Sequence, residues 1–184
     1  MKFERLAIPD VVLVTPKRFG DERGFFSETY RASLFDAEGV PGPFVQDNHA
    51  YSAEAGVLRG LHFQKPPMAQ GKLVRCVRGA IFDVAVDIRK SSATYGQHVS
   101  AELSAENGSQ LFVPAGFAHG YLTLTRDSEV EYKVTAYYAP ETEGGLAWND
   151  PDIGIKWPLP TAAPALSPKD TVLPGLTGFE TPFE

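Results

Sequence analysis

Histidine is the side chain best suited to proton transfer near neutral pH, because its ordinary pKa lies closest to 7. Two of the four histidines in the sequence stand in distinctive surroundings. His62 lies between apolar neighbours in Leu58-Arg-Gly-Leu-His-Phe-Gln, and His119 follows a tight turn in Phe112-Val-Pro-Ala-Gly-Phe-Ala-His-Gly-Tyr. A histidine in an apolar strand is usually a hydrogen-bonded core residue, but the same ring can act as a general base. The sequence around each histidine is therefore needed to distinguish a core residue from a general base.

The elements around the two histidines have the pattern of short β-strands. Two β-rich runs, residues 72–79 and 80–89, flank the turn Arg78-Gly79, which predicts a hairpin. The second run alternates between two unlike faces, one with Phe82, Val84, Val86 and Ile88 and the other with Asp83 and Asp87.

Further strands are expected at residues 110–113, 119–125 and 129–138, the last two forming a second hairpin around Arg126-Asp-Ser. In the last strand, Tyr132 shares its parity with Val130 and Val134, which predicts an inward-facing ring. One helix is expected at residues 29–39, ending at Gly39. Beyond Pro140 the chain is rich in Pro and Gly and is expected to be irregular. Many short strands with little helix predict an all-β sandwich or jelly roll.

Composition narrows the class of protein. A length of 184 residues predicts one domain, residues 1–184, and 17 Gly with 15 Pro favours turns over long helices. The net charge of −6 argues against a general nucleic-acid binder. An anionic ligand would therefore need a local cluster of Arg and Lys.

The single cysteine, Cys76, excludes an intrachain disulfide and a cysteine-based zinc site. The first residues lack the apolar core of a signal peptide, and no run approaches the ~18 apolar residues of a membrane span. We therefore expect a cytoplasmic protein that does not bind membranes.

Several short motifs follow one another along the chain with a characteristic spacing. They are Asp21-Glu-Arg-Gly-Phe-Phe-Ser-Glu28, Gln46-Asp-Asn48, Gly56-Val-Leu-Arg-Gly-Leu-His-Phe-Gln64, Gly71-Lys-Leu-Val-Arg75, Phe112-Val-Pro-Ala-Gly-Phe-Ala-His119 and Ala136-Tyr-Tyr138. Together they resemble the dTDP-4-dehydrorhamnose 3,5-epimerase family of cupin-type sugar-nucleotide epimerases, from Arg18 to Asp170. The resemblance implies a cupin-type jelly roll with a few short helices, in agreement with the all-β prediction.

The resemblance also implies an isomerase that needs no cofactor and no metal and acts on dTDP-4-dehydro-6-deoxy-D-glucose. The C4 ketone acidifies the hydrogens at C3 and C5, so epimerisation needs a base, a group that holds the enolate oxygen, and an acid. His62 matches the family's base, and Asp170 matches the carboxylate that fixes its tautomer. Lys72 matches the cation beside the C4 oxygen. Tyr132 matches the opposing acid, with Lys72 as a candidate partner for its phenolate.

The resemblance assigns the remaining matched residues to substrate binding. Phosphate or sugar contacts are implied for Arg23, Arg59 and Lys169. Thymine or ribose contacts are implied for Glu28, Gln46 and Asn48, and stacking on the base for Tyr138. Two more ligand-facing positions are His119, which would orient the sugar or Lys72, and Glu143. Without the resemblance, Arg23 and Tyr138 would be interpreted as surface-loop residues, Lys72 as a solvated charge and Asp170 as a turn former.

Two features depart from the family pattern: Ala50 stands where the family usually has Ser, and the segment 48–56 is longer than the family pattern by one residue. The resemblance further implies a homodimer in which an N-terminal strand extends the partner's sheet. The apolar run Val11-Val-Leu-Val14 suits that role.

Three alternatives remain open from the sequence. A metal-dependent cupin is disfavoured because Gln64 occupies the second position of the expected His-x-His pair. A monoepimerase acting at C3 or C5 alone would share the same base, acid and lysine. A non-catalytic sugar-binding cupin would not need His62, Lys72 and Tyr132 together.

Overall fold

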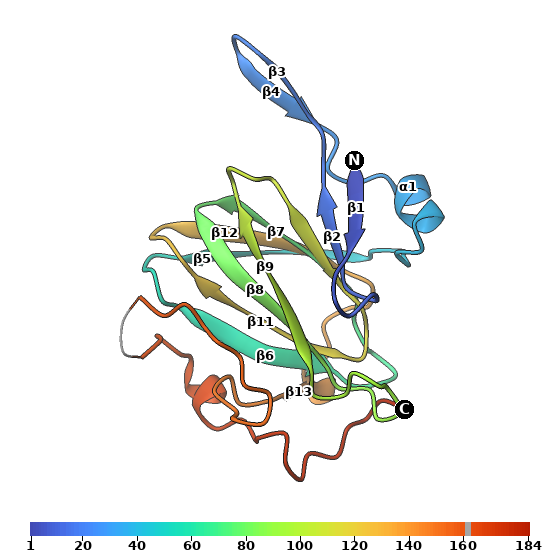
Figure 1. Cartoon of the computed structure of the whole chain (residues 1–184), viewed down its shortest axis with the longest axis vertical. Coiled ribbons are helices and arrows are strands. Elements are labelled where there is room, and N and C mark those ends of the chain that lie inside the picture. Colours follow the sequence, from blue (N-terminus) through green and yellow to red (C-terminus); the bar gives the residue numbers. More distant parts are fainter. Residues whose placement is uncertain (161–162) are drawn as a thin grey trace.

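Two antiparallel sheets face each other in the computed structural model, which describes residues 1–160 and 163–184 (Figure 1). In spatial order the first sheet contains β1 (Lys2–Arg5), β2 (Val12–Thr15), β10 (Gln110–Val113), β7 (Lys72–Arg78), β12 (Ser128–Val134) and β5 (Gln46–Ser52). The second contains β13 (Glu143–Gly145), β6 (Leu58–Gln64), β11 (Phe117–Thr123), β8 (Ala80–Asp87) and β9 (His98–Ser104). This arrangement confirms the prediction of an all-β fold.

Both predicted hairpins are wrong, because the consecutive strands lie in different sheets. β7 pairs with β10 and β12, whereas β8 pairs with β9 and β11. The turn from β11 to β12 likewise crosses from the second sheet to the first. At Gly79 (φ +73°) an added Cβ would overlap Thr125 Oγ1 and lie 2.6 Å from Ser128 Oγ, so this corner has no room for a side chain. The turns are local, but each strand finds its partners in distant segments, as in a jelly roll.

Other predicted elements occur with shifted bounds. The helix α1 (Ala32–Ala37) forms only the middle of the predicted helix, and Gly39 (φ +69°) follows it. β12 ends before Tyr138, which lies in a loop. The region beyond Pro140 contains the short helices η1 (Pro140–Thr142) and η2 (Pro168–Thr171). It also contains β13, which the sequence did not predict and which pairs with β6.

Apolar side chains pack in three layers. One cluster, including Ile81 and Ala85, fills the space between the sheets. A second, including Val84 and Val86, lies on the other face of β8. There it packs against the C-terminal segment, which runs beneath β6 in red in Figure 1. The third packs the outer face of the first sheet against α1, whose Phe35 is buried, a contribution of about 1.5–3 kcal/mol. Asp83 and Asp87 lie on the same face of β8 as Ile81 and Ala85, so the two faces differ in polarity, as predicted, but both are largely buried.

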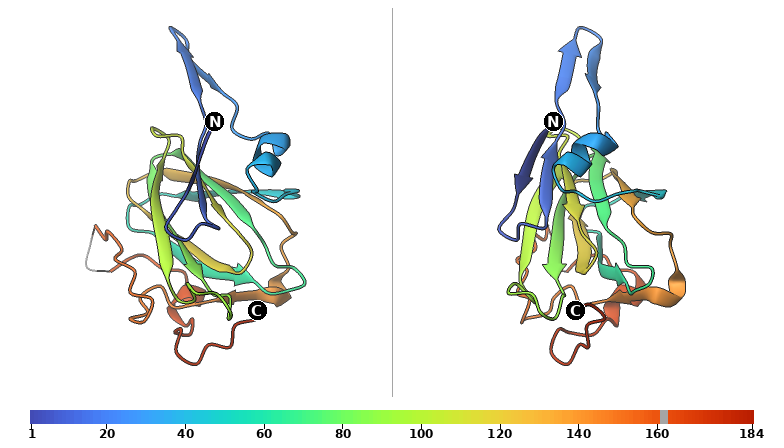
Figure 2. Two further views of the ribbon diagram at one scale, coloured as in Figure 1. Left: turned by 45° about the vertical axis from the view of Figure 1, so that its right-hand side comes forward. Right: turned by 90° about the vertical axis from the view of Figure 1, so that its right-hand side faces the viewer.

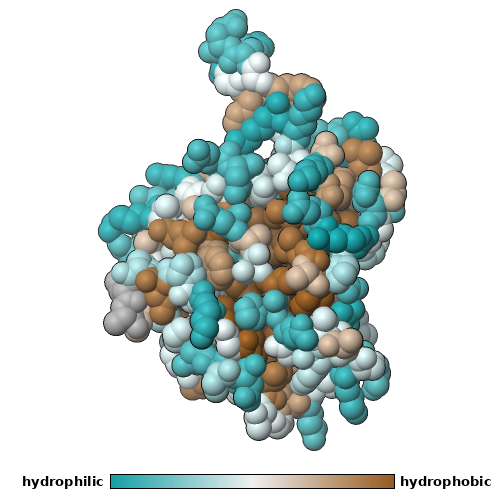
Figure 3. Space-filling model, in the orientation of Figure 1, coloured by the Kyte–Doolittle hydropathy of each residue, from teal (hydrophilic) through white to brown (hydrophobic). Residues whose placement is uncertain are grey.

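The hairpin of β3 (Arg18–Asp21) and β4 (Gly24–Ser27) projects from the sandwich in every view (Figure 2). Its tip is hydrophilic in the space-filling view (Figure 3). Three of its side chains are nevertheless large, apolar and exposed: Phe19 (55%), Phe25 (60%) and Phe26 (72%). Such a surface is typical of an interaction site.

The run Val11-Val-Leu-Val14 does not serve as a free edge strand, which corrects the expectation that it would extend a partner's sheet. β2 pairs with β1 on one side and β10 on the other, so both of its edges are used within this chain. Val11, Val12 and Val14 are buried in the chain's own core. None of the described helices is long and apolar enough to span a membrane.

Candidate active site

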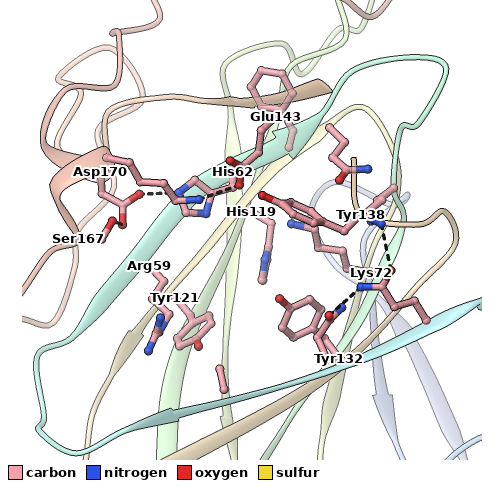
Figure 4. A pocket seen from close by; sticks show the side chains of 17 residues that line it. Arg59, His62, Lys72, His119, Tyr121, Tyr132, Tyr138, Glu143, Ser167 and Asp170 are labelled. Atoms are coloured by element: carbon pink, nitrogen blue, oxygen red, sulfur yellow. Dashed lines mark hydrogen bonds and ion pairs between the residues drawn. The ribbon is translucent and has the colours of Figure 1, made fainter. Parts of the chain in front are cut away.

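A cavity of about 410 Å³ is lined by side chains from both sheets and from the C-terminal segment (Figure 4). β5, β7 and β12 contribute from the first sheet, and β6, β11 and β13 contribute from the second. η2 adds residues from the end of the chain. The cavity thus gathers ionisable groups that are far apart in the sequence.

Arg59 and His62 both line the cavity, although residues three apart on a regular strand face opposite sides of the sheet. The register with β11 explains this. Tyr121 pairs with Arg59 and His119 pairs with His62, so β6 has one extra residue in this interval. Gly60 (φ +127°) lies in this bulge, where an added Cβ would be 2.5 Å from the backbone of β11. The bulge therefore turns Arg59 and His62 to the same face.

Regular alternation places the residues of β5 and β12. Gln46 and Asn48 line the cavity, whereas Asp47 between them lies at the surface and accepts a 2.9 Å hydrogen bond from Lys133 Nζ. On β12, Tyr132 lines the cavity and packs against the inner core, as its parity predicts.

The C-terminal segment brings a carboxylate to His62. Val57 and Ala165 form a parallel β-bridge, which holds this segment beside β6. Nε2 of His62 then lies 2.5 Å from Oδ1 of the buried Asp170, whose Oδ2 accepts a hydrogen bond from Ser167 Oγ at 2.8 Å. An ionised carboxylate only accepts hydrogen bonds, so Nε2 carries the proton and Nδ1 keeps a free lone pair.

Electrostatics keep the His62 ring ready to accept a proton. Burial lowers its pKa below the ordinary 6.5, and the Asp170 carboxylate opposes this shift. The positive charges of Lys169 and Lys72 lower the pKa further. At neutral pH the ring is therefore mainly uncharged, as a general base requires.

The opposite holds for the Tyr132 hydroxyl. Burial raises its pKa above the ordinary 10, so it keeps its proton at neutral pH and can act as a donor. The positive charges that act most on it are those of Arg59 and then Lys169. These two residues, instead of Lys72, are the principal groups that would stabilise its phenolate.

Lys72 lies at the start of β7 and lines the cavity. Burial lowers the pKa of its ammonium from 10.5 to about 8, and the negative charges of Asp83 and then Glu143 oppose the shift. Within residues 1–160 and 163–184 its Nζ makes no hydrogen bond or ion pair. Its charge is therefore available to an oxygen atom in the cavity.

Paired polar groups position the outer part of the cavity. Lys169 Nζ donates to Glu143 Oε1 at 2.7 Å. The Gln46 side chain accepts a 3.0 Å hydrogen bond from the backbone N–H of Tyr138, and its Nε2 donates to Asn48 Oδ1 at 2.8 Å. The half-exposed Tyr138 ring is thus held at the mouth by β5.

All but two of the candidate catalytic and substrate-binding residues from the sequence analysis line this cavity. The exceptions are Arg23 and Glu28, which lie on and just after the projecting hairpin. The Arg23 side chain is 84% exposed and paired with Asp21, and Glu28 pairs with Arg31. The structure does not bring either residue to the cavity of its own chain.

The sequence analysis missed other lining residues, among them Tyr121 and Ser167. Tyr121 is two residues from His119 on β11, so strand parity predicts that the two share a face. Ser167 precedes η2 and donates its hydroxyl to the Asp170 side chain instead of to the helix backbone, so no local sequence signal predicts its place in the cavity.

Gln64 also lines the cavity, at the position of the second histidine of a metal-binding cupin. Its Nε2 donates to the carbonyls of Met68 and Tyr137, and its Oε1 accepts from the N–H of Ala139. The side chain is thus fully used in holding loops together. In the described part of the chain, no group of three or more His, Cys, Asp or Glu residues is arranged to hold a metal ion.

Comparisons with known proteins agree with this geometry. A family model described as dTDP-4-dehydrorhamnose 3,5-epimerase matches residues 5–178. A curated dTDP-4-dehydrorhamnose 3,5-epimerase from Sinorhizobium fredii is 54% identical over 184 residues, which cover 100% of this chain and 94% of that protein.

Two solved structures are similar over nearly the whole chain. The dTDP-4-dehydrorhamnose 3,5-epimerase of Bacillus anthracis, with TDP and PPi bound, is 49% identical with a TM-score of 0.91, covering 95% of this chain and 99% of that one. The dTDP-6-deoxy-D-glucose-3,5-epimerase of Legionella pneumophila, in complex with dTDP-4-keto-L-rhamnose, is 43% identical with a TM-score of 0.92. That match covers 97% of this chain and 94% of the other.

Proposed function

The chain belongs to the dTDP-4-dehydrorhamnose 3,5-epimerase family, and from this premise we propose how its cavity performs the reaction. The enzyme is an isomerase of dTDP-L-rhamnose biosynthesis that inverts C3 and C5 of dTDP-4-dehydro-6-deoxy-D-glucose. The observation that carries the mechanism is the His62–Asp170 pair, with an uncharged ring beside a cavity that also holds Lys72 and Tyr132.

The base in this mechanism is Nδ1 of His62. It takes the proton from the carbon next to the ketone, and the electrons of the C–H bond move to the C4 oxygen as an enolate forms. Asp170 accepts the hydrogen bond from Nε2–H and stabilises the imidazolium that results. This pairing lets the buried ring become charged during the step.

Lys72 and Tyr132 complete the proton transfers. The Lys72 ammonium stabilises the enolate oxygen more than the neutral ketone, which lowers the barrier. Tyr132 then donates its proton to the carbon from the opposite face, which inverts the centre, and Arg59 and Lys169 stabilise its phenolate. Solvent returns the proton to Tyr132 and takes the proton from His62, so both groups are reset. His62 and Lys72 act in the same way at the second carbon, where protonation depends less on Tyr132.

Nucleotide binding is assigned to the outer part of the cavity. Arg59 and Lys169 supply positive charge for the diphosphate, which the net charge of −6 does not provide. Tyr138 presents a half-exposed ring on which thymine can stack, beside the amides of Gln46 and Asn48. His119 and Glu143 face the sugar.

NMR of dTDP-4-dehydro-6-deoxy-D-glucose incubated with the enzyme in D2O tests this function. We expect deuterium at both C3 and C5, and a product that a 4-ketorhamnose reductase accepts. Deuterium at one carbon alone would indicate a monoepimerase, and no exchange would indicate a sugar-binding cupin. A stoichiometric transition metal in the purified enzyme would contradict the cofactor-free mechanism.

We also propose that the enzyme is a homodimer in which the β3–β4 hairpin of one copy reaches the cavity of the other. Arg23 and Glu28 match substrate-binding positions of the family but lie outside their own cavity. The exposed Phe25 and Phe26 beside them supply apolar surface that a second copy would bury. Sedimentation or light scattering tests the dimer, and cell fractionation tests the expected cytoplasmic location.

A further inference from the structure

Asp83 is a buried carboxylate that the mechanism above does not use. It lies on the inward face of β8 with Ile81 and Ala85, in the apolar space between the sheets, and is fully buried. Its Oδ1 accepts a 2.9 Å hydrogen bond from His119 Nε2. Its Oδ2 has no hydrogen-bond partner in the described residues. An unmatched charge in such a place is costly unless an opposite charge compensates it.

Lys72 is the natural counterpart of this carboxylate. Lys72 is half-buried in the cavity wall, and its Nζ has no hydrogen bond or ion pair in the part of the chain that the structure describes. Asp83 acts on it more strongly than any other negative group. In the sheet Asp83 is the register partner of Tyr121, which lines the cavity together with His119. Register partners in an antiparallel pair share a face, so the Asp83 side chain points between the sheets, on the same side as the cavity-lining Tyr121 and His119.

We propose that Asp83 is a positioning residue, whose buried carboxylate keeps Lys72 in its protonated form and holds His119 in a single orientation. The first effect maintains the cation that the enolate oxygen requires. The second follows from the hydrogen bond, because a proton on His119 Nε2 leaves Nδ1 as an acceptor. Asp83 touches no substrate and acts only through these two residues.

Several charged groups surround Lys72, and the assignment to Asp83 depends on their balance. Glu143 on β13 raises the pKa of Lys72 as Asp83 does, whereas Lys169 on η2 lowers it. The other titratable groups that line the cavity with Lys72 are Arg59 and His62 on β6, His119 and Tyr121 on β11, Tyr132 on β12, Asp170 on η2, and Tyr138, while Cys76 of β7 lies near Asp83. Among these neighbours Asp83 has the largest stabilising effect on the ammonium.

The test is an NMR titration of the Lys72 side chain in protein labelled with 13C-lysine, with its signal assigned from a Lys72→Arg spectrum. Asp83→Asn removes the charge but keeps an oxygen that can accept from His119. We expect the Lys72 pKa to fall from about 8 in the wild-type enzyme by about one pH unit or more in Asp83→Asn. The alkaline limb of kcat/KM should move to lower pH by the same amount. An unchanged Lys72 titration would overturn the proposal.

Asp87→Asn is the matched control, because Asp87 is equally buried on the same strand but binds Arg89, Ser92 and Thr94. It should lower Tm and leave the Lys72 titration unchanged. An equal shift in both variants would overturn the proposal, because it would reflect general loosening of β8.

A second measurement needs no variant of Asp83. In wild-type enzyme the 13C signal of the Asp83 carboxyl should respond at the pH where Lys72 titrates, since coupled groups report each other. No response there would also overturn the proposal. The role of Lys72 in catalysis rests on the proposed function, but these titrations do not. Epimerase activity that fails with the titrations intact would therefore contradict the function alone.

Discussion

At the scale of single residues, the environment of the cavity gives the proposed base and the proposed acid opposite pKa shifts. Burial lowers the pKa of His62 and raises that of Tyr132, so one group lacks its proton at neutral pH and the other keeps it. In the proposed mechanism, the hydrogen bond to Asp170 stabilises the His62 ring after it accepts a proton. The two groups thus begin each cycle in the protonation states that the reaction needs.

Replacing the base tests its role most directly. His62→Ala should reduce turnover and C–H exchange by about 100-fold or more, the usual contribution of a positioned base. Its binding of dTDP, measured by calorimetry, should stay close to wild type, since the nucleotide contacts lie elsewhere. Activity like that of the wild type would remove His62 as the base.

Tyr132→Phe should affect proton exchange at C3 and at C5 to different extents. Without the hydroxyl, protonation from one face fails, and deuterium incorporation followed by NMR should drop at one carbon more than at the other. Equal loss at C3 and C5 would show that the tyrosine is only structural. A melting curve like that of the wild type serves as the control for folding.

The pH dependence of kcat/KM follows from His62 and Lys72. His62 must be uncharged, so activity falls as the pH drops through its pKa, which lies below 6.5. Lys72 must be charged, so activity falls as the pH rises through about 8. We expect a bell-shaped profile with its maximum between these values. A profile without an alkaline limb would contradict the role of the Lys72 ammonium.

At the scale of the elements, the bulge in β6 decides whether Arg59 and His62 can act together. Gly60→Ala would place a Cβ 2.5 Å from the Cα of Gly120 and 2.8 Å from the carbonyl oxygen of His119. β6 and β11 would then have to separate. We expect a loss of about 1–3 kcal/mol in the free energy of unfolding and a fall in kcat/KM.

Gly178→Ala is the control for Gly60→Ala. Gly178 also has a positive φ (+78°), but no described atom would lie within 4 Å of the added Cβ. Gly178→Ala should lower the free energy of unfolding by about 1 kcal/mol, because a side chain disfavours the positive φ, and it should leave kcat/KM unchanged. Equal effects of the two substitutions in denaturant titrations would contradict the role of the bulge.

The sequence predicts the elements better than their pairing. Alternation in residues 80–89 and 129–138 correctly indicates strands and turns Tyr132 inward, because this information is local. The jelly-roll partners of each strand come from distant segments, so two turns that look like hairpins were misassigned. The three-residue spacing of Arg59 and His62 makes sense only with the bulge opposite β11.

For the candidate site too, the sequence identifies individual residues better than the contacts between them. The motifs identify His62 and Lys72 by resemblance, but the contact from His62 to Asp170 spans 108 residues. No periodicity predicts such a contact. The sequence places Asp83 only on one face of a strand and does not predict its burial, because that burial depends on packing between two sheets.

At the scale of the whole molecule, the β3–β4 hairpin holds Arg23 away from the cavity of its own chain, and Arg23 is proposed to act in the cavity of a second copy. Hybrid dimers test this arrangement. One subunit would carry Arg23→Ala and the other His62→Ala, each with a different affinity tag so that only hybrids are purified. If Arg23 acts in the partner's cavity, the hybrid has one intact site and regains about half of the wild-type activity.

The two parental homodimers are the controls, and both should be impaired, by loss of substrate contact in one and of the base in the other. A hybrid no more active than the Arg23→Ala parent would contradict action across the dimer. Such a result would leave the base and the acid untouched, because they lie within one subunit.

The bridge between Val57 and Ala165 also has a consequence for synthesis on the ribosome. The strands of the sandwich precede residue 146, but the carboxylate that partners His62 is Asp170, on a segment that is synthesised after all of these strands. A nascent chain can therefore form its sandwich while its base is still unpartnered. In the proposed mechanism, catalytic competence arises only after Asp170 has been synthesised, so exchange activity reports on chains that extend at least that far and not on shorter folded fragments.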